Sequence, residues 1–155
     1  RRGQIGIFNR SHYEDIVTVR VRELAPRSVW RRRPGHVNEF ERLLSEEGTT
    51  IVKVYLHLSK EEQRERLQER VDSPEKRWKF REDDLDNRRL WADYMEAFED
   101  TITETSTEWA PWYVVPTDRN WVRNVAVASL LVETLRELDP QIPEPAKGIA
   151  GTIVE

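Results

Sequence analysis

The chain has 155 residues, of which 35% are charged and 37% are hydrophobic, and its formal net charge is −4. This length allows one domain with its own core, and no apolar run approaches the length of a membrane span. Cysteine is absent, which excludes a disulfide framework and a cysteine-ligated metal and suits a reducing compartment.

Charge is distributed unevenly along the chain. Residues 1–33 carry nine Lys/Arg against three Asp/Glu, residues 60–89 carry ten of each, and the remainder carries six against sixteen. A basic first segment on an acidic body suggests an anionic ligand at one face, such as a nucleotide, a polyphosphate or nucleic acid. Nucleic acid is the least favoured, because the basic stretch 20–33 offers only Trp30 for stacking on bases.

The stretch 4–15 begins with an apolar run and ends in polar side chains. Ile5, Ile7 and Phe8 predict a buried strand of an α/β sheet. The polar side chains that follow are Asn9, Arg10, Ser11, His12, Glu14 and Asp15. Ligands of open α/β sheets bind beyond the carboxyl ends of strands, where phosphoryl-transfer proteins place the acid or amide that orients Mg²⁺ or its water. An ordinary polar loop fits the pattern equally well.

The next segments contain one clear helix. Residues 16–35 leave a strand and a helix-breaking connector both open, and residues 31–35 (RRRPG) predict a basic turn. Residues 36–47 predict a helix, with Val37, Phe40, Leu43 and Leu44 at helical spacing. Gly48 is expected to end it.

A second strand and a charged helix follow. Residues 51–58 (IVKVYLHL) form the clearest strand pattern in the chain. Ser59 and Glu62 then form a capping-box pattern, which predicts a helix that runs to about Arg70. The alternating Arg and Glu of this helix can be surface pairs four residues apart.

Pro74 interrupts the helical pattern within residues 72–80, where three basic residues lie close to Trp78 and Phe80. A further helix is predicted over about 83–104. Its apolar side, interpreted as core, consists of Leu85, Trp91, Tyr94, Met95, Phe98 and Ile102. Arg88 and Arg89 lie near the predicted start of this helix, where the helix dipole does not favour a cation, so they point mildly to an external anion.

The last elements complete an alternating pattern of strands and helices. Residues 112–115 predict a short strand that ends at Pro116, and Thr117 or Asp118 is expected to cap a helix over 119–138. The side chains expected to face inward are Val122, Val125, Ala126, Leu130, Leu131 and Leu135. Residues 139–155 look like a loose tail. The alternation predicts an α/β fold with a parallel sheet.

Three blocks of sequence resemble the polyphosphate kinase 2 family. They are residues 8–15 (FNRSHYED), residues 72–80 (DSPEKRWKF) and residues 105–116 (TSTEWAPWYVVP). The blocks occur in the family's order and, with the segments between them, extend over nearly all of residues 3–135. Three separate blocks in order make this resemblance highly specific.

The resemblance implies a P-loop kinase-like fold similar to thymidylate kinase, with a parallel sheet flanked by helices and a helical lid. The domain would cover residues 1–138, with the lid at about 60–89 and a C-terminal tail at 139–155. The implied reaction moves a terminal phosphate between inorganic polyphosphate and a nucleoside mono- or diphosphate of the AMP/ADP type. Its metal cofactor would be Mg²⁺, with Mn²⁺ as the alternative. A cytoplasmic homo-oligomer without membrane contact is expected.

The resemblance also assigns roles to individual residues. The first block looks like the family's Walker B region. Asn9, Arg10 and Arg70 would be catalytic, and Asn9, which stands where many members have Asp, would also hold Mg²⁺ through a bound water. The residues expected to bind phosphate or polyphosphate are Arg66, Lys76, Arg77, Lys79 and Arg88. The residues expected to bind the nucleotide are Asp84, Asp118 and Arg119.

One departure from the family pattern is serious. The sequence contains no G-x-x-x-x-G-K-[ST] loop or similar glycine-lysine loop, which the family places upstream of the first block. We therefore expect the N-terminal strands and the phosphate loop to be absent from this chain. In the strand order 2-3-1-4-5 the strands present here match 3, 4 and 5, so the strand at 4–8 and the strand at 51–58 would flank a gap. We expect residues 1–155 alone to be neither stable nor active.

Two other functions stay open at this point. A non-catalytic remnant that binds anions or a partner subunit would explain the missing phosphate loop. An ATP-using nucleotide kinase would share the fold, although the block at 72–80 argues against it.

Overall fold

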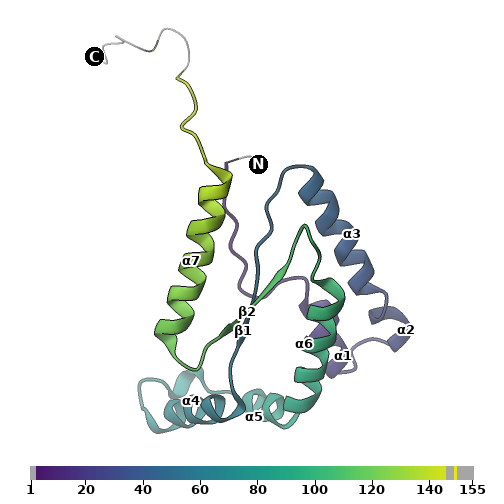
Figure 1. The fold of residues 1–155 in the computed structure, drawn as a ribbon. Coiled ribbons are helices and arrows are strands. Elements are labelled where there is room, and N and C mark those ends of the chain that lie inside the picture. The colour runs from purple at the N-terminus through teal and green to yellow at the C-terminus, as the bar shows by residue number, and fades with distance from the viewer. Residues whose placement is uncertain (1–2, 146–148, 150–155) are drawn as a thin grey trace.

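The structure is a computed structural model that describes residues 3–145 and 149. Its elements in chain order are α1 (Glu14–Val21), α2 (Arg27–Trp30), α3 (Arg33–Glu46), β1 (Lys53–His57), α4 (Lys60–Asp72), the 3₁₀ turn η1 (Arg77–Lys79), α5 (Glu82–Arg89), α6 (Trp91–Thr105), β2 (Trp112–Pro116) and α7 (Asn120–Leu138). In Figure 1, α7 stands to one side of the sheet, α1, α3 and α6 stand to the other, and α4 and α5 lie beyond the strand ends.

The sheet has two strands, which pair in parallel. Lys53 of β1 lies opposite Trp112 of β2, and the register continues to His57 opposite Pro116. Parallel neighbours need a long crossover connection, which α4, α5 and α6 supply here. The two later predicted strands and the parallel α/β class are thus confirmed.

The strand predicted at 4–8 is wrong for this structure. These residues have no regular secondary structure, and the sheet that the described residues form contains only β1 and β2. Ile5 is 74% exposed, Ile7 88% and Phe8 83%. Figure 1 shows this segment running from the N-terminus toward the sheet. An apolar run becomes a strand only where another strand satisfies its N–H and C=O groups, and the described residues supply none.

The segment left open between strand and connector is helical. In α1, Ile16 and Val17 are buried and the helix packs on α6. Glu14 and Asp15 lie in its first turn, where the helix dipole favours negative charge. Packing against α6, which sequence spacing does not show, therefore decides between the two alternatives.

The basic turn predicted at 31–35 is wrong in part, because α3 begins at Arg33 with Pro34 in its first turn. Proline is well tolerated there, since the first N–H groups of a helix lack a partner within the helix. The predicted end is confirmed: α3 stops at Glu46, and Gly48 has a φ of 84°. Only glycine adopts such a left-handed conformation without strain.

The start of α4 follows the capping pattern. The Ser59 hydroxyl accepts a hydrogen bond from the backbone N–H of Glu62 at 3.1 Å. The Glu62 side chain binds Arg66 instead of returning to the cap, so only half of the capping box forms.

The helix predicted over 83–104 is wrong as a single element. It divides at Leu90 into α5 and α6, because α5 contacts α4 through Arg88 whereas α6 packs on α1 and α3. Leu85 is exposed, so it is not part of the core. Arg88 and Arg89 now lie in the last turn of α5, where the helix dipole favours cations. Their position therefore gives no argument for an external anion.

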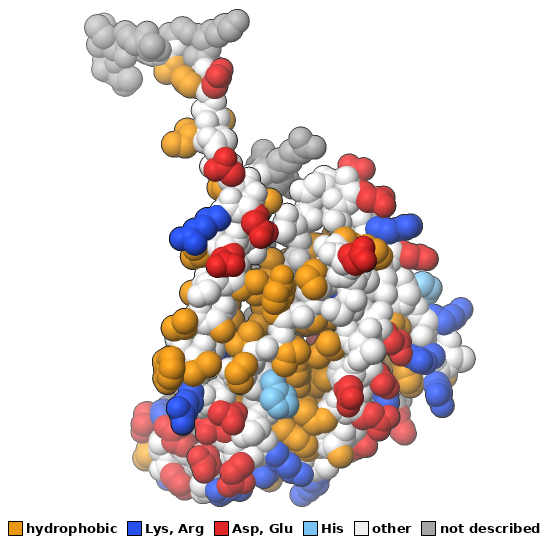
Figure 2. Space-filling view, in the orientation of Figure 1, with side chains coloured by type: hydrophobic (Ala, Val, Ile, Leu, Met, Phe, Trp, Pro, Cys, Tyr) orange, Lys and Arg blue, Asp and Glu red, His pale blue; other side chains and the backbone are white. Residues whose placement is uncertain are grey.

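Neither predicted cap begins the last helix. The N-cap of α7 is Arg119, whose side chain makes no capping hydrogen bond. The Thr117 hydroxyl donates instead to the carbonyl of His57 at the end of β1, and the Asp118 carboxylate accepts from the backbone N–H of Ser59, just after β1. The side chains predicted to face inward are partly or largely exposed, Val125, Leu131 and Leu135 among them. Hydrophobic side chains gather over the middle of the face shown in Figure 2, beside α7.

The best-buried region lies where α1, α3 and α6 meet the sheet. Its apolar members include Tyr13, Ile16, Val17, Ala97, Ala110 and Val115, and its polar members include Glu41, Lys53, Thr101 and Thr105. Within the described part of the chain, none of the helices combines the length and the apolar composition of a membrane span. Residues 139–145 of the predicted tail have no regular structure and are exposed, and most of the rest of the tail lies outside the described residues.

Candidate functional site

The carboxyl ends of β1 and β2 are joined by hydrogen bonds. The backbone N–H and the hydroxyl of Thr117 donate to the carbonyl of His57, at 2.8 and 3.0 Å. The backbone N–H of Ser59 donates to Asp118 Oδ1 at 2.8 Å. This N–H holds the pKa of the Asp118 carboxyl below its usual value. Asp118 therefore lies at the sheet edge where α/β proteins bind ligands.

Arg66 connects α4 to this edge. Its Nη2 donates to the carbonyls of Thr117 at 2.8 Å and Asp118 at 3.2 Å, and its Nε donates to Glu62 Oε1 at 2.7 Å. The structure thus brings together Arg66 and Asp118, which were predicted to bind phosphate and nucleotide respectively. Arg119, which was also predicted to bind the nucleotide, is exposed at the start of α7.

Three further predicted residues join α4 to α5. Arg88 Nη1 donates to the carbonyl of Lys60 at 2.5 Å and to Gln63 Oε1 at 3.2 Å. Arg70 Nη1 lies 3.9 Å from Asp84 Oδ2. A half-exposed pair at that distance contributes little to stability. Arg70 can therefore exchange this partner for an external anion at small cost.

The turn around η1 holds the other predicted cations in different environments. Lys76 pairs with Glu69, and Arg77 Nε donates to the carbonyl of Val71 at 2.7 Å. The Lys79 ammonium lies 5.2 Å from the centroid of the Trp78 ring, a cation–π contact. Arg77 and Lys79 are exposed, and Lys76 is half-buried.

Arg10 and Glu14 form the strongest charged contact of the N-terminal turn. Arg10 Nε and Nη2 donate to the two carboxylate oxygens of Glu14, both at 2.9 Å, and the Thr18 hydroxyl adds a donor at 2.6 Å. This paired geometry raises the pKa of Arg10 and lowers the pKa of Glu14. Glu14 received no role from the sequence, although its place four residues after Arg10 at a helix start was the available signal.

The backbone at Arg10 is unusual. Its φ is 67°, in the left-handed region that side chains other than glycine seldom adopt. Such a conformation costs on the order of 1–3 kcal/mol and is concentrated at functional sites. Asn9, directly before it, is exposed. The turn that carries Asn9 and Arg10, two of the three predicted catalytic residues, is thus held in a specific and uncommon shape.

Oxygen ligands for a metal are present but sparse. Among residues 3–145 and 149, no three His, Asp or Glu side chains gather closely enough to hold a metal ion by themselves. Asn9 and Glu14 offer oxygen atoms near one another in sequence, and Mg²⁺ takes one or two protein ligands together with waters and substrate phosphates. The residues present therefore fit Mg²⁺ only if waters and substrate phosphates supply most of its ligands.

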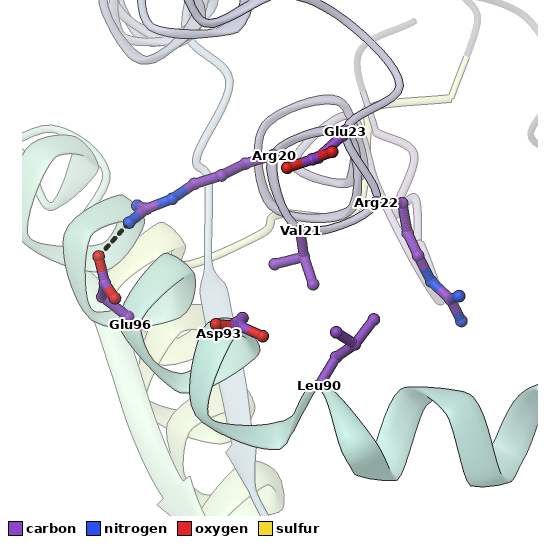
Figure 3. A pocket seen from close by; sticks show the side chains of 7 residues that line it. All are labelled: Arg20, Val21, Arg22, Glu23, Leu90, Asp93 and Glu96. Carbon is purple, nitrogen blue, oxygen red and sulfur yellow. Dashed lines mark hydrogen bonds and ion pairs between the residues drawn. The ribbon is translucent and has the colours of Figure 1, made fainter.

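Two hollows are lined by none of the predicted site residues. The larger, of about 530 Å³, is lined by residues of α1, the segment after it and the α5–α6 junction. In Figure 3, Arg20 reaches across to Glu96, while Val21 points toward Leu90. Arg20 is paired with Glu96 at 2.5 Å and with Asp100 at 2.6 Å, so it offers little free positive charge.

The smaller hollow, of about 290 Å³, lies between α1 and α3 and is lined by His12, Arg33 and Phe40 among others. Neither hollow contains a residue predicted to act on phosphate or nucleotide. We expect the lid cations, Arg66, Arg70, Lys76, Arg77 and Lys79, to border a cleft together with Arg10, and neither hollow tests this prediction.

The fold is shared with solved polyphosphate kinase 2 structures. The chain is similar to the crystal structure of Polyphosphate Kinase 2 from Arthrobacter aurescens TC1, with a TM-score of 0.86 and 44% sequence identity over 91% of this chain and 50% of that one. It is also similar to the crystal structure of a putative polyphosphate kinase 2 from Pseudomonas aeruginosa, with a TM-score of 0.80 and 34% identity over 86% of this chain and 29% of that one.

The family assignment follows from sequence as well. The family model described as Polyphosphate kinase 2 (PPK2) matches residues 1–143, so the chain belongs to this family and the resemblance noted in the sequence is confirmed. An AMP/ADP-polyphosphate phosphotransferase of Meiothermus ruber is 57% identical over 155 residues, which is 100% of this chain and 58% of the relative. An ADP-polyphosphate phosphotransferase of Rhodopseudomonas palustris is 43% identical over 92% of this chain and 54% of the relative. The chain thus spans somewhat more than half the length of each relative.

Proposed function

We propose that this chain forms part of a phosphotransferase that moves a terminal phosphate between inorganic polyphosphate and a nucleoside mono- or diphosphate of the AMP/ADP type. One observation carries the proposal: all 155 residues match a relative named as an AMP/ADP-polyphosphate phosphotransferase at 57% identity. The N-terminal turn with Arg10 and the strand-end cluster of Arg66 and Asp118 supply residue types that suit the reaction.

The chemistry asks mainly for placed positive charge. A phosphoryl group in transfer carries negative charge on its equatorial oxygens, and catalysis consists largely of positioning and cationic stabilisation. Arg10 and Arg70 would act on that group, and the lid cations would hold the phosphate chain along a track. Guanidinium groups suit this role because they bind two phosphate oxygens at once.

A divalent cation would join the site with the substrate. Asn9 would hold Mg²⁺, or Mn²⁺, through a bound water, and phosphate oxygens of the substrate would supply further ligands. The ion would supply charge neutralisation on the phosphates. Asn9 and the Arg10–Glu14 pair would orient the substrate around it.

A further polypeptide segment, which carries the family's phosphate loop, would pack on residues 4–8 and along the unpaired edge of β1. Ile5, Ile7 and Phe8 expose their side chains, as does Leu56 of β1. Because β1 pairs only with β2 among the described residues, its other edge can accept a strand. The relatives are longer than this chain, which supports a family segment as the occupant.

A chimera tests the function directly. The part of the Meiothermus ruber relative that this chain does not match would be joined to residues 1–155, and transfer from polyphosphate and from ATP to AMP and ADP would be measured with and without Mg²⁺. We expect transfer from polyphosphate that needs the metal. In the chimera, Arg10→Ala or Arg70→Ala should lower transfer by on the order of 10²–10³-fold, the scale of losing one transition-state donor.

Arg136→Ala is the matched control, because this arginine lies in the last turn of α7, away from both candidate clusters. Equal losses at all three arginines would contradict the assignment. If the full-length relative transfers phosphate and the chimera does not, the non-catalytic remnant becomes the better explanation, which the missing glycine-lysine loop favours. Transfer from ATP alone would instead indicate a nucleotide kinase.

A further inference from the structure

A cluster of buried charged and polar side chains joins five elements behind the N-terminal turn. Lys53 of β1 is 6% exposed, Glu41 of α3 is 1% exposed, and Tyr13, at the start of α1, is 7% exposed. Lys53 Nζ donates to Glu41 Oε2 at 2.6 Å and to the carbonyl of Thr105 in α6 at 2.7 Å. The ring of Trp112 in β2 lies 5.3 Å from the same ammonium.

Every strong hydrogen-bonding group in this cluster is satisfied. The third donor of Lys53 goes to the Tyr13 hydroxyl at 2.9 Å, and that hydroxyl donates to Glu41 Oε1 at 2.8 Å. An ammonium has three donors, so Lys53 is saturated. A fully satisfied buried network is rigid, because moving any one member leaves another without a partner in a low-dielectric interior.

Stability alone does not require such a cluster. Replacing a buried ion pair by well-packed apolar side chains is often neutral or stabilising, since desolvating two charges offsets most of their attraction. The network therefore invites an explanation in what it positions. Tyr13 is the N-cap of α1 and lies three residues after Arg10, whose backbone has the unusual φ of 67°.

We propose that the Lys53–Glu41–Tyr13 cluster positions the turn that carries Asn9 and Arg10, with the Tyr13 hydroxyl as the connecting group; this proposal rests on the proposed phosphotransferase function. The Tyr13 ring is fixed on two sides, by Trp112 at 4.8 Å between ring centroids and by His12 at 4.7 Å. The hydroxyl fixes the remaining rotation by binding both charges. Arg10 is then held on the α1 side of the turn through Glu14.

Tyr13→Phe removes this single hydroxyl and keeps the ring. In the chimera, we expect kcat for transfer from polyphosphate to fall by roughly 10- to 100-fold, the scale of a misplaced catalytic group, with KM for polyphosphate within about twofold. Tyr55→Phe is the matched control: Tyr55 is partly buried, and within the part of the chain that the structure describes its hydroxyl hydrogen-bonds only to Met95 Sδ, at 3.9 Å. Its kcat should stay within about twofold of the parent value.

Two double variants separate positioning from folding. Lys53→Met with Glu41→Leu removes both charges and the acceptor for Tyr13, whereas Lys53→Met with Glu41→Gln keeps an acceptor for the Tyr13 hydroxyl. We expect both double variants to fold. Only Lys53→Met with Glu41→Gln should have a kcat within about threefold of the parent value. If both double variants match the parent, the cluster is structural only and the proposal is wrong.

Hydrogen exchange gives a readout that does not depend on activity. The backbone N–H groups of Glu14 and Asp15 donate to the carbonyls of Ser11 and His12, at 3.0 and 3.1 Å. In Tyr13→Phe these two amides should exchange about tenfold faster than in the parent, and in Tyr55→Phe they should not change. Unchanged exchange in Tyr13→Phe overturns the proposal even if the chimera proves inactive. An inactive chimera with faster exchange would contradict only the proposed function.

Discussion

Phe8 offers a sharp test of whether a further segment packs over residues 4–8 in the complete enzyme. Phe8 is 83% exposed in this structure, and Trp78, in the turn around η1, is 77% exposed. Judged by exposure alone, truncating either ring should change the free energy of unfolding by no more than about 0.5 kcal/mol. The two residues have similar exposure, but only Phe8 lies where a further segment is proposed to pack.

If a further segment packs over residues 4–8, Phe8→Ala should cost about 3–5 kcal/mol in the chimera, the usual loss for a buried ring. Trp78→Ala should stay near 0.5 kcal/mol, because the turn around η1 lies outside the proposed contact. The measurement is urea unfolding of the chimera followed by circular dichroism. An effect of Phe8→Ala as small as that of Trp78→Ala would refute the reasoning.

Three further predictions concern the charged groups and the caps. Lys53→Met alone should destabilise the chimera by about 3–5 kcal/mol, because it leaves Glu41 charged and buried, and adding Glu41→Leu should restore most of that loss in urea unfolding. Because Arg10 lowers the pKa of Glu14, the stability from this pair is complete above the ordinary pKa of 4.5 and is lost as the pH falls through the lowered pKa. An NMR titration of Glu14 should therefore show a midpoint below 4.5, and Arg10→Ala should raise that midpoint. Ser59→Ala should cost about 0.5–2 kcal/mol through loss of the α4 cap. Ser73→Ala should cost less than about 0.5 kcal/mol in the same assay, because the Ser73 side chain makes no hydrogen bond to the other described residues and only its backbone N–H binds the end of α4.

Local signals in the sequence determined much of the fold. The strand patterns at 51–58 and 112–115 become β1 and β2, because each is apolar along its length and the two strands pair with each other. Ser59 starts α4 and Gly48 follows α3, because capping and left-handed backbone depend on one residue and its immediate neighbours. The three ordered blocks at 8–15, 72–80 and 105–116 were enough to indicate the family, which the comparisons confirm.

Only the tertiary structure decided the rest. Residues 4–8 have the pattern of a strand, but a strand exists only where a partner edge meets it. The division of the predicted helix at Leu90 depends on α5 and α6 following different neighbours. Lys53 and Glu41 are charged residues that a sequence pattern assigns to the surface. Their burial could not be predicted, because each tolerates the interior only when the other, with Tyr13, satisfies its hydrogen bonds there.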